Sequence, residues 1–104
     1  MRHGLLQRDI DEILQALRRF PEIDEAIVFG SRAKGKYKPG SDVDIAIKGK
    51  EITHSCVSSL SFILNEESLL PYFFDIVHYE GTTERDLVQH IDRFGKILYR
   101  RSEG

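Results

Sequence analysis

Two short motifs near the middle of the chain constrain its fold most: Gly30-Ser31 and, after ten intervening residues, Asp42-Val43-Asp44. Residues 25–29 form a short apolar run directly before the glycine, and residues 42–48 form a second run that begins with the two acids. Each run has the length and composition of a strand. The sequence therefore predicts two strands, with a sharp turn into a short helix directly after the first.

The spacing of the two acids predicts a metal site. Side chains two residues apart on a strand lie on the same face, roughly 6.6 Å apart along the backbone. Two carboxylates crowded together repel each other unless a cation lies between them. Mg²⁺ prefers oxygen ligands and completes its shell with water and substrate phosphates. Asp42 and Asp44 are therefore candidate ligands of Mg²⁺.

The glycine-serine turn predicts a phosphate site beside these acids. Gly30 allows the backbone to approach a ligand closely, and N–H groups at a helix start, together with the Ser31 hydroxyl, suit phosphate oxygens. Four cationic side chains follow within seven residues: Arg32, Lys34, Lys36 and Lys38. This loop favours a polyanion, although Lys36 and Lys38 are equally well explained as a solvated surface.

In these motifs the chain resembles the minimal nucleotidyltransferases (MNT type) of the DNA polymerase beta-like superfamily. In that family a strand ends in Gly-Ser, about ten residues intervene, and Asp-x-Asp opens the next strand. The resemblance extends over most of the chain, including Arg32 and Gly35 in the turn. The family carries a third carboxylate on a later strand, and Asp75 is the one acid in the apolar run 72–77. The resemblance therefore assigns that role to Asp75.

The resemblance implies an in-line transfer of a nucleotidyl group from ATP with two Mg²⁺ ions. The implied catalytic and metal-binding residues are Asp42, Asp44 and Asp75, of which Asp75 would also take the proton from the attacking hydroxyl. Gly30 and Ser31 would hold the outer phosphates.

The basic residues of the turn complete the implied nucleotide site. Arg32 or Lys34 would offset charge on the pyrophosphate. We favour Arg32 over the lysines because its planar guanidinium suits phosphate.

MNT-type proteins are often encoded beside HEPN-domain proteins and act as antitoxins of HEPN ribonuclease toxins. The resemblance thus implies transfer of AMP to a protein hydroxyl, a tyrosine of such a toxin, in a hetero-oligomer with it; a homodimer is the other arrangement considered. Two alternatives remain open: a non-catalytic antitoxin that neutralises its partner by binding, and an enzyme that acts on a small-molecule hydroxyl.

Length and composition limit the remaining options. With 104 residues, of which 40% are hydrophobic and 31% charged, the chain is expected to form a single domain, 1–104. A net charge of −2 argues against direct binding of nucleic acid or of an anionic membrane. Cys56 has no second cysteine to pair with, and no apolar stretch has the length of a signal or membrane segment. The cytoplasm is the expected location.

Periodicity predicts an α+β fold in which a small mixed β-sheet is covered by helices. The expected strands are 25–29, 42–48 and 73–79; the expected helical segments are 6–20, 31–35, 53–67 and 83–94, followed by an apolar tail at 97–99. The helix after the second strand is long enough to bring the third strand alongside, so the three acids should meet at one sheet edge. His3, His54, His78 and His90 lack metal-ligand spacing, and surface or packing roles are expected for them.

Overall fold

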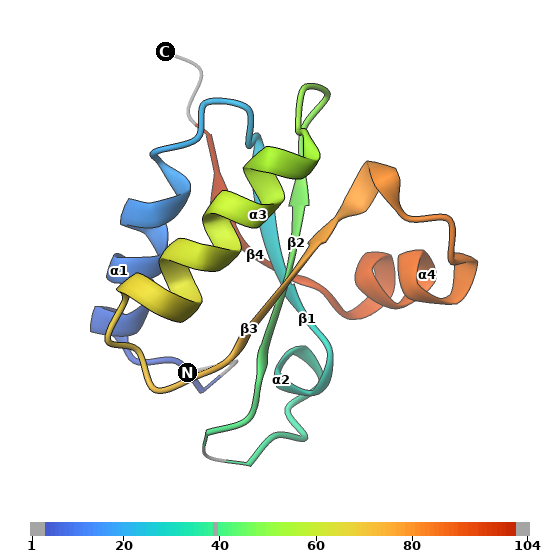
Figure 1. Ribbon diagram of the computed structural model, residues 1–104. Helices are drawn as coiled ribbons and strands as arrows, with labels where there is room; N and C mark the ends of the chain where they lie inside the picture. Colours follow the sequence, from blue (N-terminus) through green and yellow to red (C-terminus); the bar gives the residue numbers. More distant parts are fainter. Residues whose placement is uncertain (1–3, 39, 102–104) are drawn as a thin grey trace.

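Four strands form one mixed sheet in the computed structural model, which describes residues 4–38 and 40–101 (Figure 1). The strands lie in the order β3-β2-β1-β4, so the first two strands of the chain occupy the centre of the sheet. This arrangement confirms the predicted mixed sheet. The strand bounds are Glu25–Phe29 for β1, Val43–Lys48 for β2, Phe74–His78 for β3 and Lys96–Arg100 for β4.

The two central strands are antiparallel, whereas β2 and β3 run parallel. A parallel neighbour requires a crossover connection, which here consists of helix α3 (His54–Phe62) and a π-helical turn, η1 (Ile63–Glu67). The Thr53 hydroxyl accepts a hydrogen bond from the N–H of Cys56 at 3.1 Å and so caps the start of α3, as its position before the helix predicts. The predicted crossover helix is therefore confirmed.

Helices cover both faces of the sheet (Figure 1). Helices α1 (Gln7–Leu17) and α3 lie on one side, and α4 (Arg85–Phe94) lies on the other. Alternation along β2 separates the two faces, because Val43, Ile45 and Ile47 belong to the core under α1 and α3 whereas Ala46 belongs to the core under α4. Asp44 alternates with the first set and therefore lies on the face that α4 covers.

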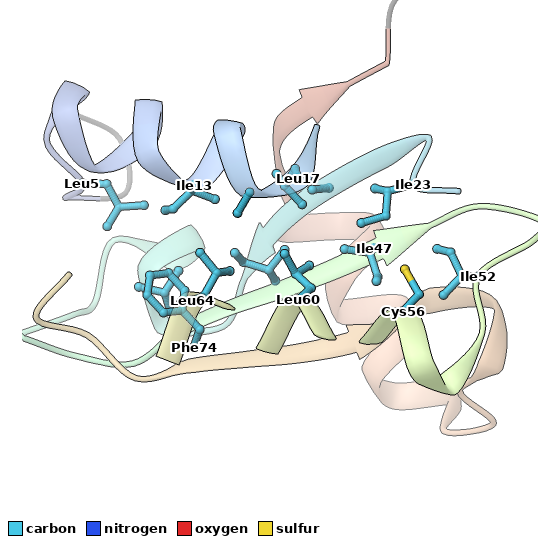
Figure 2. Packing of buried hydrophobic residues seen from close by; sticks show 14 residues of the cluster. Leu5, Ile13, Leu17, Ile23, Ile47, Ile52, Cys56, Leu60, Leu64 and Phe74 are labelled. Atoms are coloured by element: carbon cyan, nitrogen blue, oxygen red, sulfur yellow. The ribbon is translucent and has the colours of Figure 1, made fainter. Parts of the chain in front are cut away.

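The larger core fills the space between α1, α3 and the sheet (Figure 2). The apolar face of α1 contributes to it: Ile13 and Leu17 are fully buried, and Ile10 and Leu14 pack against the cluster. From α3, Cys56 and Leu60 enter the same core, so the cysteine is a buried hydrophobe, as its position on the apolar stripe suggests. A smaller core joins Ile91 of α4 to the opposite face of the central strands.

The apolar tail predicted at 97–99 is in fact part of strand β4, which pairs antiparallel with β1 at the sheet edge. Arg100 donates a hydrogen bond to the Glu25 carboxylate at 2.7 Å, and the N–H of Arg101 donates to the carbonyl of Asp24 at 2.8 Å. Periodicity gave no clear strand signal here because the segment is short and has charged ends. Its apolar residues are also not all buried, since Ile97 is 56% exposed.

No helix in residues 4–38 and 40–101 is both long enough and apolar enough to cross a lipid bilayer. Helices α1 and α3 each contribute an apolar face to the larger core, and α4 contributes one to the smaller core.

Candidate active site

The turn after β1 requires a glycine. Gly30 has φ 76° and ψ −152°, a backbone conformation that is strongly unfavourable for every residue except glycine. A Cβ added there would lie 2.2 Å from Oδ2 of Asp44. The turn thus brings the start of α2 (Ser31–Lys34) directly against the first acid of β2. The sharp turn into a short helix predicted at this point is confirmed.

Parallel pairing places the acid of β3 beside the acid of β2. Asp44 and Asp75 are register partners in this pair, and Phe29, the last residue of β1, is the partner of Asp44 on the other side. Register partners in neighbouring strands point to the same face of a sheet. Asp44 and Asp75 therefore lie side by side, at the end of the sheet where the glycine turn begins. Asp42 is exposed and immediately precedes β2.

The charges of Asp42 and Asp75 act on Asp44. The pKa of the Asp44 carboxyl is raised above its ordinary value, mainly by burial and then by the negative charges of Asp75 and Asp42. As the side chains stand, residues 4–38 and 40–101 contain no group of three or more acidic, histidine or cysteine side chains close enough to hold a metal ion. Asp44 and Asp75 are nevertheless register neighbours that carry hard oxygen donors and like charge, which is the donor chemistry that a divalent cation prefers.

Two of the residues predicted to contact phosphate are accessible. Ser31 is exposed at the first position of α2, next to the Gly30 turn. Lys34 is exposed at the last position of the same helix, and its Nζ lies 4.9 Å from the centroid of the Phe94 ring on α4. Both side chains are therefore accessible to a ligand.

Arg32 has a different environment from these two. Its side chain is only 1% exposed, and its guanidinium donates hydrogen bonds to the carbonyl oxygen of Ser41 from Nε at 3.2 Å and from Nη2 at 2.9 Å. The rings of Tyr37 and Tyr72 lie 5.0 and 4.9 Å from the guanidinium carbon. The structure thus gives Arg32 partners within the protein, where the sequence predicted a phosphate.

His90 has a role at the site that sequence analysis missed. Its Nε2 accepts a hydrogen bond from the N–H of Gly30 at 2.8 Å, and its ring packs edge-on against Phe29 at 6.0 Å. The contact fixes the glycine turn to α4, so this N–H is engaged within the protein. The signal in the sequence was a polar residue inside the apolar stripe formed by Leu87, Ile91 and Phe94.

Asn65 has a similar role at the start of β3. Its side-chain amide donates to the carbonyl of Phe74 at 2.9 Å and accepts from the N–H of Phe74 at 2.7 Å. Asn65 lies in the π-helical turn η1, a kind of distortion that often occurs at functional sites. The two bonds hold the backbone directly before Asp75. Nothing in the sequence pattern marked this contact.

We expect Gly30→Ala to destabilise the protein more than Gly35→Ala. At Gly35 the backbone is in the left-handed helical region, with φ 76° and ψ 12°, where alanine costs roughly 1–2 kcal/mol, whereas at Gly30 ψ is −152° and the backbone strain of alanine is larger. Gly35 has no atom within 4 Å of an added Cβ, whereas at Gly30 the Cβ would collide with Asp44. Urea denaturation of the two variants measures the difference. Equal losses would show that Asp44 does not pack against the turn.

We expect Asp44→Asn to raise the free energy of unfolding at pH 7 in the presence of EDTA. Because the folded state raises the pKa of Asp44, ionising it costs stability, and this cost is present above the folded pKa and vanishes in acid below the unfolded pKa. The gain from asparagine should therefore appear as the pH rises through the raised pKa. Asp11→Asn, at an exposed position on α1, is the control. A gain that grows as the pH falls would contradict the assignment.

Comparison with known proteins places these features in a family. The sequence matches the family Polbeta, described as "Polymerase beta, Nucleotidyltransferase", over residues 11–104. No relative was found among curated protein sequences.

Several solved structures share the fold. A chain in a toxin–antitoxin crystal structure with AMP-PNP superposes with a TM-score of 0.74 and 25% identity, covering 89% of this chain and 74% of that one. A chain of a MntA-HepT toxin–antitoxin structure gives a TM-score of 0.70 and 23% identity over 92% of this chain and 74% of that one. A chain from the structure of a tri-AMPylated Shewanella oneidensis HEPN toxin in complex with an MNT antitoxin gives a TM-score of 0.69 and 24% identity, covering 91% of this chain and 72% of that one.

The matched range, residues 11–104, spans all four strands, and the architecture agrees with that of the solved structures. This chain therefore belongs to the polymerase beta nucleotidyltransferase family.

Proposed function

We propose that this protein is a Mg²⁺-dependent adenylyltransferase that moves AMP from ATP to a hydroxyl group, a tyrosine of a HEPN-domain toxin, and so acts as an antitoxin. The observation that carries the proposal is the register of β2 and β3, which sets Asp44 beside Asp75 at the Gly30 turn. Family membership supports transfer of a nucleotidyl group. The choice of AMP is supported by the similar structures, one with AMP-PNP and one with an AMPylated toxin.

Asp42, Asp44 and Asp75 are the residues that would hold Mg²⁺, as two ions. The donor chemistry fits such a cation, because Asp44 and Asp75 are register neighbours and the pKa of Asp44 is raised by burial and by the charges of the other two acids; the three side chains would draw together on binding it. When bound, Mg²⁺ would supply charge stabilisation for the entering and leaving oxygens of the transferred phosphoryl group.

The chain's own groups account for binding and for the proton. Ser31, exposed beside the turn, would donate a hydrogen bond to the outer phosphates, and the exposed Lys34 would offset the charge of the departing pyrophosphate. Asp75 is exposed on the edge strand β3, where an incoming hydroxyl can reach it, and would take the proton of that hydroxyl. The hydroxyl oxygen then bonds to the α-phosphorus while the bond to pyrophosphate breaks.

The partner is inferred from the similar structures. They come from toxin–antitoxin complexes, and one of them contains a HEPN toxin that carries AMP groups. The chain resembles these structures over most of its length and most of theirs. We therefore expect a hetero-oligomer with a HEPN-domain protein.

Incubation with a HEPN-domain protein encoded beside this gene, Mg²⁺ and ATP labelled in the α-phosphate should transfer the label to that partner. The double variant Asp42→Asn with Asp44→Asn should lower the rate by more than about 100-fold, since even outer-shell changes at metal sites commonly cost 10–100-fold. Asp11→Asn on the far side of the sheet should transfer label at the wild-type rate, which controls for the loss of a surface charge.

The same experiment separates the alternatives. A partner that stays unlabelled but is still inhibited, equally by the wild type and the double variant, would indicate neutralisation by binding. Label that appears on a small hydroxyl compound in preference to the partner would indicate a small-molecule acceptor. Either result would overturn transfer to a protein.

A further inference from the structure

Arg32 and Asp9 stand out because the structure buries them although both carry charge; they are 1% and 4% exposed. A buried charge costs several kcal/mol unless hydrogen bonds and an opposite charge or polarised group compensate it. Such groups are retained where their partners fix a defined geometry. What Arg32 contacts is therefore informative about its role.

The guanidinium of Arg32 is anchored on the loop that leads into β2. Two of its nitrogens, Nε and Nη2, donate to the carbonyl oxygen of Ser41, the residue directly before Asp42. The loop is also closed on itself, because the Ser41 hydroxyl accepts from the N–H of Lys38 at 2.8 Å and donates to its carbonyl at 2.7 Å. Holding Ser41 therefore holds the backbone directly before Asp42.

Two tyrosine rings keep the guanidinium in this position. Tyr37 and Tyr72 lie on it at 5.0 and 4.9 Å, a geometry that suits a planar cation. The Tyr72 hydroxyl donates to Oδ2 of Asp9 at 2.8 Å, and this same oxygen accepts from the N–H of Leu6 at 3.2 Å. The network thus connects the loop before Asp42 with the start of α1 and with the segment before β3.

The pKa of Tyr72 is raised, first by burial and then by its hydrogen bond to Asp9. Its hydroxyl therefore stays protonated and keeps donating across the physiological range.

We propose that Arg32 is a positioning residue, which fixes Asp42 through the carbonyl of Ser41, and is not a ligand of the nucleotide phosphates. The inference rests on the proposed function, because it assumes that Asp42 holds Mg²⁺. It changes the role that the sequence predicted for Arg32 and leaves Ser31 and Lys34 as the accessible groups of the turn for phosphate contacts.

The test separates metal affinity from nucleotide affinity by titration calorimetry. One series varies Mg²⁺ at fixed ATP, and the other varies ATP at saturating Mg²⁺. Arg32→Lys keeps the charge but cannot make the forked hydrogen bonds or the flat stacking contact. We expect it to raise the Mg²⁺ concentration for half-maximal binding about 10–100-fold, as loss of an outer-shell partner commonly does, with little change in ATP affinity at saturating Mg²⁺.

Tyr37→Leu provides a second variant if Arg32→Lys does not fold, because it removes one ring and keeps the guanidinium. It should shift the Mg²⁺ dependence in the same direction. Arg18→Lys, the same exchange at an exposed position directly after α1, should change neither titration.

The outcomes distinguish this inference from the proposed function. If Arg32→Lys weakens ATP binding at saturating Mg²⁺ and leaves the Mg²⁺ dependence unchanged, Arg32 is a phosphate ligand and the inference is wrong. An unchanged Mg²⁺ dependence in Tyr37→Leu would contradict it as well. If the wild-type protein binds ATP with no dependence on Mg²⁺, the proposed function is overturned together with the inference.

Discussion

Parallel pairing of β2 with β3 is the constraint on which the site depends. Its register sets Asp44 opposite Asp75 and Ile45 opposite Ile76, so the alternation that directs isoleucines into the core under α1 and α3 also directs both acids to the other face. A slip of one residue would turn Asp75 into that core and expose its apolar neighbours. Burial of Ile45 and of Phe74, both 0% exposed, therefore stabilises the arrangement of the acids as well as the sheet. The electrostatic cost of this arrangement is visible in the raised pKa of Asp44.

Side chains from three different elements hold the backbone next to the site residues. Arg32 in α2 binds the carbonyl before Asp42, Asn65 in η1 binds both backbone groups before Asp75, and His90 in α4 binds the N–H before Ser31. Each contact fixes the backbone of one residue, and the side chain of the next residue along the chain is predicted to contact metal or nucleotide. Geometry of this kind matters because small displacements of catalytic groups cost large factors in rate. In a small domain, such contacts fix the loops that the sheet itself does not hold.

The sequence was sufficient to predict the sheet centre and the placement of Asp44 beside Asp75 at the glycine turn, for identifiable reasons. The turn after β1 needs a glycine on both backbone and packing grounds, so Gly30 follows from local rules. The face of Asp44 follows from the alternation along β2, whereas Asp42 was expected inside this strand and in fact immediately precedes it. The position of Asp75 beside Asp44 needed the crossover helix as well, which the apolar spacing in α3 supplied. Contacts between distant segments were not predictable: β4 depends on pairing with β1, and the environment of Arg32 depends on two tyrosines from different loops. A basic residue after Gly-Ser suggested phosphate because α2, with four residues, is too short for periodicity to indicate which of its side chains become buried.

The central claim is that Asp42, Asp44 and Asp75 form one site for Mg²⁺ and a triphosphate, and thermal unfolding of the Asp75→Asn variant tests it most directly. A ligand that binds the folded state at 100 times its Kd stabilises it by about 2.7 kcal/mol. The account predicts that Mg²⁺ and ATP together raise the melting temperature of the wild-type protein, that neither does so alone to the same extent, and that Asp75→Asn loses most of the rise while Asp11→Asn keeps it. An equal rise in Asp75→Asn and the wild type would contradict the account, because Asp75 would then not belong to the site.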